Sequence, residues 1–295
     1  MRLLSLSTGS LSHLLGKEYY DFNTIVSLMN TLHSRAVIDG FEFQNIAEWD
    51  SVGPPRDENR ESSHIGARAR AWKSCSKFTI DELANSIRNT GLPILSVHAN
   101  RDVGICLCAG DEDDIERGKE LINTTLSFCN ALGSKVAVFH FWDTWTRTID
   151  NGFLSDILDD YQLRFPDVRA SVENVPTSVD GLTPFEISKQ FNYITLDTRW
   201  ACIYDELDRY YDLLPRIVNI HLRGRLADEQ WIFDSSTRTF DEVISLIRDN
   251  WRYSGLVTME PEGGYRGATI EALVEALEEL RMKLGYPSRK RSHRA

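Results

Sequence analysis

Four short stretches decide the fold, namely VRASVEN (168–174), YITLD (193–197), RIVNIHL (216–222) and GLVTMEP (255–261). Each is an apolar, largely β-branched run that carries an ionisable residue at or near its end; these residues are Glu173, Asp197, His221 and Glu260. Short runs rich in Val, Ile and Leu are typical of strands buried on both faces, as in a parallel sheet. We therefore predict four strands of one parallel sheet, each with a polar side chain at its carboxyl end.

The remaining chain repeats this pattern. Four similar runs come earlier, LLSLSTG (3–9), VIDGFEF (37–43), LPILSVH (92–98) and KVAVFHF (135–141). Amphipathic, helix-like segments separate the runs, at 22–33, 79–91, 111–133, 151–164, 183–190, 204–214, 239–250 and 269–284. Eight strands in alternation with eight helices indicate an α/β fold, a single-domain (β/α)8 TIM barrel. A doubly wound open sheet is the alternative, and it is disfavoured because the first strand lacks a glycine-rich phosphate loop.

The barrel is expected to span residues 1–286, with two segments set apart. Residues at about 45–78, after the second strand, form a polar loop of a length that is usually functional or disordered. A lid over the site and an insertion without a role both remain open. Residues 287–295, PSRKRSHRA, form a basic tail that we expect to be flexible.

Composition excludes several classes of protein. The 295 residues are 42% hydrophobic and 26% charged, as in an ordinary globular protein. Thirty-three basic minus 44 acidic residues give a net charge of −11, which disfavours nucleic acid as a partner. No apolar run approaches the roughly 20 residues that span a bilayer. Five cysteines without a disulfide-framework spacing favour a cytoplasmic location.

The four ionisable strand ends predict a metal site. In a (β/α)8 barrel the carboxyl ends of all strands face one mouth, so Glu173, Asp197, His221 and Glu260 should converge. Buried carboxylates and imidazoles are unfavourable unless they are paired or coordinated. Three carboxylates and one imidazole suit one divalent ion, Mn²⁺, Mg²⁺, Co²⁺ or Zn²⁺. Separate salt bridges at the barrel rim are the alternative.

The same residues carry a resemblance to a known family. Their contexts, SVENVP, TLDTRW, NIHLRG and TMEPEGG, resemble the xylose isomerase-like TIM-barrel superfamily. Its members include sugar isomerases, ketose 3-epimerases, inosose dehydratases and endonuclease IV-type DNA repair enzymes. The resemblance implies that Glu173, Asp197, His221 and Glu260 are metal ligands. It also implies that Glu173 and Glu260 move protons on the two sides of a substrate.

Further residues near the mouth are predicted to bind the substrate. By the resemblance, His98 and His140 match strand-end histidines that bind substrate in sugar enzymes, or further zinc ions in the nucleases. Arg223 lies where a substrate oxygen or phosphate could be held. The full set also contains Glu42 at the end of the second strand and two tryptophans that follow strands and could form an apolar wall, Trp142 and Trp200.

Differences from the family's residue pattern disfavour one of these functions. Nuclease-type members have a histidine shortly after the aspartate that matches Asp197, where this chain has Arg199 and Trp200. They also have an Asp-x-His pair after the next strand, which LRGRLADEQWIFD lacks. An endonuclease IV-like phosphodiesterase is therefore disfavoured. Many sugar enzymes also have a histidine at the Trp200 position.

The leading hypothesis is a metal-dependent isomerase or epimerase. It would act on a small sugar-like polyol carbonyl compound, a sugar or cyclitol, by enediolate proton transfer. A non-catalytic metal- or metabolite-binding barrel and an inosose-type dehydratase remain open as alternatives. We also expect that the chain could form a homo-oligomer.

Overall fold

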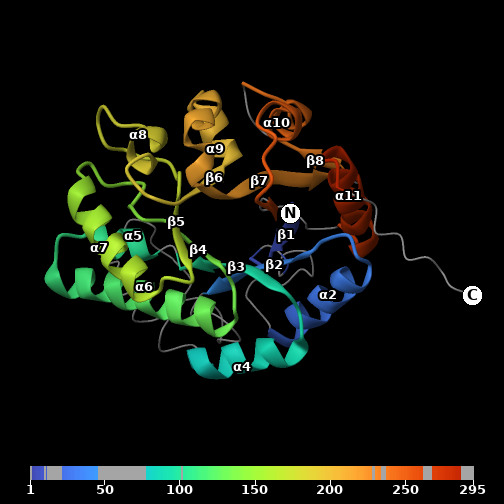
Figure 1. Ribbon diagram of the computed structural model, residues 1–295, viewed down its shortest axis with the longest axis horizontal. Helices are drawn as coiled ribbons and strands as arrows, with labels where there is room; N and C mark the ends of the chain where they lie inside the picture. The colour runs from blue at the N-terminus through green and yellow to red at the C-terminus, as the bar shows by residue number, and fades with distance from the viewer. Residues whose placement is uncertain are drawn as a thin grey trace, which may run out of the picture.

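Eight parallel strands close into a barrel (Figure 1). The computed structural model describes residues 2–9, 11, 22–45, 78–100, 102–227, 230–233, 237–261 and 268–286. The barrel strands are β1 (Leu3–Ser7), β2 (Gly40–Asn45), β3 (Ile94–Ala99), β4 (Val136–Phe139), β5 (Arg169–Glu173), β6 (Ile194–Asp197), β7 (Ile217–Ala227) and β9 (Leu256–Pro261). Each strand pairs with its neighbour in chain order, and β9 pairs with both β7 and β1, which closes the ring. The predicted (β/α)8 barrel is confirmed.

Helices surround the strands, as Figure 1 shows. The α-helices among the described residues are α2 (Phe22–Ser34), α4 (Ile80–Thr90), α5 (Asp102–Cys108), α6 (Glu112–Ala131), α7 (Asn151–Arg164), α8 (Pro184–Ser188), α9 (Thr198–Ile203), α10 (Phe240–Ser245) and α11 (Ile270–Lys283). Their apolar faces pack on the outward side chains of the barrel and form one large core. This core holds the strands in place, so their carboxyl ends are fixed relative to one another.

Local signals set the helix ends where the sequence predicts them. The Thr79 side chain accepts a hydrogen bond from the Glu82 amide, and the Glu82 carboxylate accepts one from the Thr79 amide, which is a complete capping box. Gly91 ends α4 in the left-handed conformation, with φ of 69°. Gly133, with φ of 71°, follows α6 in the same way.

Three features differ from the sequence-based expectation. Strand β7 continues beyond the predicted Leu222 to Ala227 and forms an antiparallel hairpin with β8 (Gln230–Ile232). The short helices α5 and α9 were not predicted. The helix expected at 204–214 is a 3₁₀ helix at Leu207–Arg216, which contains Pro215, and a proline removes a backbone donor that an α-helix needs. Residues 46–77 and 287–295 lie outside the described residues, so the predicted loop and tail stay predictions.

The register of the strands gathers polar side chains in the barrel. Because side chains alternate along a strand, Asn219, His221 and Arg223 share one face of β7. His221 lies beside Asp197 of β6, and Arg223 lies beside Glu260 of β9. The interior therefore becomes increasingly charged toward the carboxyl ends of the strands.

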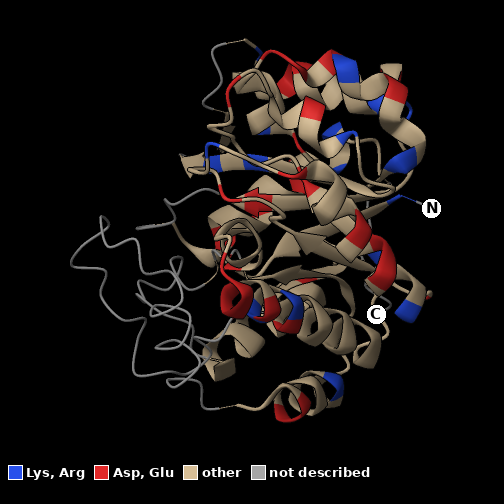
Figure 2. Ribbon diagram, turned by 90° about the vertical axis from the view of Figure 1, so that its left-hand side faces the viewer, with Lys and Arg blue, Asp and Glu red and all other residues tan. Residues whose placement is uncertain are grey.

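The outer surface carries mixed charge. Figure 2 shows acidic and basic residues interspersed over the helices of one side. In the part of the chain that the structure describes, no helix combines the length and hydropathy that crossing a membrane requires.

Candidate metal centre

Four strand-end residues meet at the carboxyl end of the barrel. Each of Glu173, Asp197, His221 and Glu260 offers an oxygen or nitrogen atom, and these atoms all lie within 4.8 Å of one another. They come from β5, β6, β7 and β9, and the first three are fully buried. The structure thus brings together all four residues predicted as ligands.

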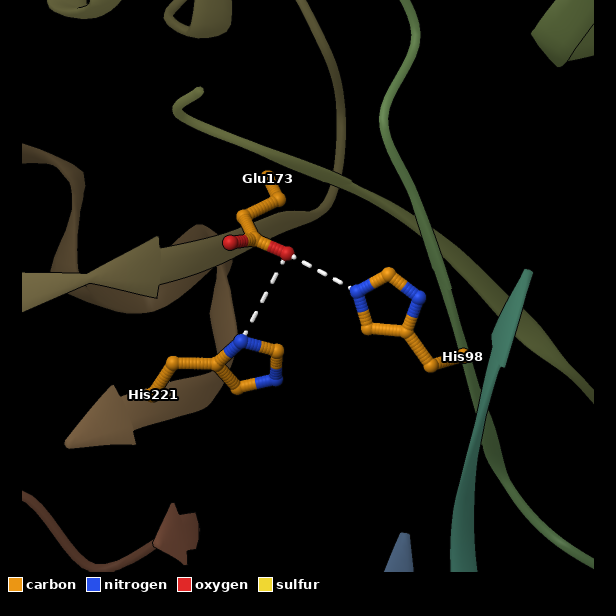
Figure 3. Close-up of side chains that lie close together, drawn as sticks. All are labelled: His98, Glu173 and His221. Carbon is orange, nitrogen blue, oxygen red and sulfur yellow. Dashed lines mark hydrogen bonds and ion pairs between the residues drawn. The ribbon is translucent and has the colours of Figure 1, made fainter. Parts of the chain in front are cut away.

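Glu173 lies among imidazoles (Figure 3). Its Oε2 atom lies 3.1 Å from His98 Nε2, 3.2 Å from His140 Nε2 and 3.5 Å from His221 Nδ1. The other nitrogen of His98, Nδ1, lies 2.8 Å from the Ala99 carbonyl oxygen. His98 of β3 and His140, which directly follows β4, therefore reach the same carboxylate.

The two carboxylate oxygens of Asp197 have different partners. Its Oδ1 atom accepts hydrogen bonds from the amides of Arg199 and Trp200, at 2.8 and 3.0 Å, and so caps α9. Asn174 anchors its backbone, because the Asn174 Oδ1 atom accepts the Asp197 amide and its Nδ2 atom donates to the Asp197 carbonyl. The Oδ2 atom is left to face the cluster, 3.0 Å from Arg223 Nε.

Arg223 places a guanidinium among the carboxylates. Its Nη2 atom donates to Glu260 Oε2 at 2.7 Å and lies 3.7 Å from Glu173 Oε1. The Trp200 ring stacks on this guanidinium, with 5.5 Å between Arg223 Cζ and the ring centroid. Arg223 and Trp200, both predicted to bind substrate, thus lie at the cluster.

The other two residues predicted to bind substrate are buried. Trp142 is 1% exposed, and its Nε1 atom donates to the Pro176 carbonyl at 3.0 Å. Glu42 is fully buried and lies beside Ser96 of β3. A role in substrate binding stays a prediction for both.

Charges of opposite sign control the pKa values in the cluster. Burial, together with Glu173 and Glu260 and against the effect of Arg223, raises the pKa of Asp197 to about 7. Burial acts to raise the pKa of Glu260 as well, but Arg223 and His221 outweigh it and hold that pKa well below its ordinary value. Burial acts to lower the pKa of His98, but the Glu173 carboxylate outweighs it and raises the pKa to about 9. The carboxylates thus draw positive charge into the barrel mouth.

The donor set fits a divalent cation. Glu173 Oε1, Asp197 Oδ2 and His221 Nδ1 are buried atoms without a well-aligned hydrogen bond to any described residue, and their close contacts, 3.7 Å to Arg223 Nη2, 3.0 Å to Arg223 Nε and 3.2 Å to Glu260 Oε2, are ion pairs within the cluster. Each belongs to one of the four clustered residues, and each has a lone pair available when deprotonated. Oxygen donors with one imidazole nitrogen suit Mn²⁺, Mg²⁺, Co²⁺ or Zn²⁺. These residues could therefore hold one metal ion.

Sequence reasoning overlooked the groups that support the cluster. Asn174 anchors Asp197, and Ser96 and Asn219 bond to Glu42. A signal for Asn174 was present, because it directly follows Glu173 in SVEN. Ser96 and Asn219 lie two residues before His98 and His221, so strand alternation places them on the same inward face.

Comparison with known proteins identifies the fold. Neither a scan against protein-family models nor a search of curated proteins finds a match. Among solved structures, an L-ribulose 3-epimerase aligns with a TM-score of 0.63 and 15% identity over 97% of this chain and 95% of that one. A 3-keto-D-glucoside 4-epimerase from E. coli gives 0.59 and 15%, covering 96% and 100% of the two chains. A D-psicose 3-epimerase from Clostridium cellulolyticum H10, solved with D-tagatose, gives 0.57 and 15%, covering 96% and 99%. At this identity the chain shares the (β/α)8 fold of these sugar epimerases.

Proposed function

We propose that this protein is a divalent-metal-dependent epimerase or isomerase of a small sugar or cyclitol that contains a carbonyl group. The observation that carries the proposal is the convergence of Glu173, Asp197, His221 and Glu260 within 4.8 Å of one another. The fold shared with sugar epimerases over 96–97% of this chain supports it. When bound, a divalent cation would polarise the carbonyl and stabilise the negative charge that develops beside it.

Proton transfer is assigned to the two glutamates. Glu173 and Glu260 come from β5 and β9, which are not neighbours in the barrel, and their carboxylates both contact His221 and Arg223. One would remove the proton next to the carbonyl, and the other would return a proton to the opposite face. His98 and His140, which contact Glu173, would hold substrate hydroxyls near that carboxylate.

Exchange of substrate hydrogen with solvent tests this assignment. The Mn²⁺-loaded protein is incubated with ketoses, aldoses and cyclitol ketones in D₂O, and deuterium at the carbon beside the carbonyl is followed by NMR. We expect the wild type to incorporate deuterium into at least one compound. Glu173→Gln and Glu260→Gln should each lower the rate by a factor of 10² or more, since general acid–base catalysis contributes about 10²–10⁴. Full exchange in both variants would contradict the assignment.

A non-catalytic binding barrel is a second candidate. The observation in its favour is Arg223, whose guanidinium lies between Asp197 and Glu260 under the Trp200 ring. That arrangement neutralises part of the cluster without a metal ion. Bound metal without exchange or turnover across the same compounds would favour this candidate over the enzyme.

A further inference from the structure

A buried carboxylate contacts the imidazole of the four-residue cluster through the ring nitrogen opposite the one that faces Glu173 and Glu260. Glu42 Oε2 lies 3.1 Å from His221 Nε2, while the opposite nitrogen, Nδ1, faces Glu260 at 3.2 Å and Glu173 at 3.5 Å. Both His221 and Glu42 are fully buried. One ring nitrogen of His221 therefore contacts Glu42, and the other faces the rest of the cluster.

Glu42 is itself held in place by fixed donors. Its Oε2 atom accepts hydrogen bonds from Ser96 Oγ at 2.8 Å and from Asn219 Nδ2 at 3.1 Å. Asn219 is oriented in turn, because its Oδ1 atom accepts a hydrogen bond from Thr258 Oγ1 at 3.0 Å. These side chains come from β2, β3, β7 and β9, so the network ties four strands to one carboxylate.

We propose that Glu42 is a positioning residue that fixes the ring orientation and tautomer of His221 for metal binding. Glu42 Oε2 accepts the Nε2 proton of His221, which leaves the lone pair of Nδ1 directed at the space between Glu173 and Glu260. An imidazole that donates its second N–H to a carboxylate is also a stronger metal ligand. This inference rests on the proposed metal site and does not depend on which substrate is converted.

Titration of Mn²⁺ into the metal-stripped full chain tests the proposal, with isothermal calorimetry as the readout. The wild type should bind one equivalent. Glu42→Ala should bind one equivalent about 10–100-fold more weakly, the usual effect of removing such a partner. Glu42→Gln should lose less, because its amide oxygen still accepts the Nε2 proton but carries no charge. Gln is also nearly the same shape, so it keeps the test open if the alanine variant fails to fold.

Asp39→Asn is the matched control. Asp39 is also a buried carboxylate, but it lies at the opposite end of β2 and pairs with Arg281 at 3.2 Å. This variant should unfold at a lower temperature and keep the wild-type affinity for Mn²⁺. The visible spectrum of the Co²⁺-loaded protein should change in Glu42→Gln and stay unchanged in Asp39→Asn, because only Glu42 contacts a ligand.

Each outcome decides a different claim. A folded Glu42→Ala or Glu42→Gln protein that binds Mn²⁺ as tightly as the wild type overturns the positioning role and leaves the metal site standing. An equal loss of affinity in Asp39→Asn also overturns it, because the loss would then report stability alone. A wild-type chain that binds no Mn²⁺ overturns the metal site and this inference together.

Discussion

Arg223 places its guanidinium between the carboxylates that we propose hold the metal ion. A divalent cation and the guanidinium compete for the same oxygens of Asp197 and Glu260. We therefore expect Arg223→Ala to bind Mn²⁺ about tenfold more tightly, because hydrogen bonds between charged groups are worth about 1.5–3 kcal/mol. Calorimetric titration of the stripped protein measures the change.

Arg199→Ala is the control for this prediction. Arg199 also stacks on Trp200, with its Cζ atom 5.0 Å from the ring centroid, so its removal changes the indole environment as well. Its affinity for Mn²⁺ should stay within a factor of about three of the wild type, a change of less than about 0.7 kcal/mol. Weaker binding in Arg223→Ala would mean that the arginine supports the ligands and does not compete with the metal.

Proton release should accompany metal binding. Burial raises the pKa of Asp197 to about 7. Burial opposes protonation of His221, but Glu42 and Glu173 outweigh it and raise its pKa well above the ordinary value. Both groups must lose a proton to bind a cation, so affinity for Mn²⁺ should rise with pH across the neutral range. Titrations at pH 6, 7 and 8 measure this, and a dissociation constant that is independent of pH would contradict it.

At the residue scale, the sequence predicted which residues form the cluster but not the hydrogen bonds and ion pairs between them. The ionisable residues at the ends of four apolar runs were enough to predict that Glu173, Asp197, His221 and Glu260 lie together. The position of the Arg223 side chain was not predictable, because it depends on rotamers and on charges from three other strands. The contact of Glu42 with Ser96 also depends on the register of β2 against β3, which shifts between Phe41 and Glu42.

At the scale of helices and strands, α5 packs closely against the segment that follows β4. A Cβ atom on Gly104 would lie 2.5 Å from the Trp142 amide nitrogen and 2.6 Å from the Trp142 carbonyl oxygen. Because both atoms belong to the backbone, Gly104→Ala must push α5 away from the segment that follows His140. We expect a loss of about 1–3 kcal/mol in the free energy of unfolding, as for overpacking in a core. Urea unfolding measures it.

Gly152→Ala is the matched control, in α7. A Cβ atom there would meet only Asp150 Oδ1 at 3.4 Å, an ordinary contact. The alanine should leave stability unchanged or raise it by up to about 1 kcal/mol, the usual difference between the two residues in a helix. Equal effects of the two substitutions would show that the approach of α5 to Trp142 is not tight.

Strands with clear boundaries in the sequence were easier to predict than the short helix α9 and the β7–β8 hairpin. The runs that became β5, β6 and β9 end within about a residue of their predicted positions, because turn and ionisable residues bound them. Helix α9 has only six residues and begins directly after Asp197, so no helical period could be recognised. The β7–β8 hairpin carries Arg223 and Arg225 between apolar residues, and this polar alternation hid the continuing strand.

One buried ion pair joins the first and last parts of the molecule. Asp39 Oδ2 accepts hydrogen bonds from the Leu4 amide at 2.8 Å and from Arg281 of α11 at 3.2 Å. Asp39→Ala would leave Arg281 buried without this partner, so we expect a loss of about 3–5 kcal/mol in the free energy of unfolding. Adding Arg281→Met should restore much of that loss, and urea unfolding of both variants checks it.

An exposed ion pair provides the comparison. Glu116 pairs with Lys119 on the surface of α6, where the Glu116 side chain is 71% exposed. Glu116→Ala should change the free energy of unfolding by less than about 0.5 kcal/mol, because solvent screens such pairs. A loss in Asp39→Ala no larger than this would show that the buried pair does not hold the two ends of the chain together.

Metal content of the purified protein tests the central claim most directly. After loading with Mn²⁺ and removal of unbound ions, the wild type should retain one equivalent by elemental analysis. His221→Ala removes the imidazole at the centre of the cluster and should retain less than a tenth of that amount, because a loss of affinity by a factor of about 100, or about 2.8 kcal/mol, takes a site that is nine-tenths occupied to less than one-tenth occupied. Equal metal content in the two folded proteins would contradict the account.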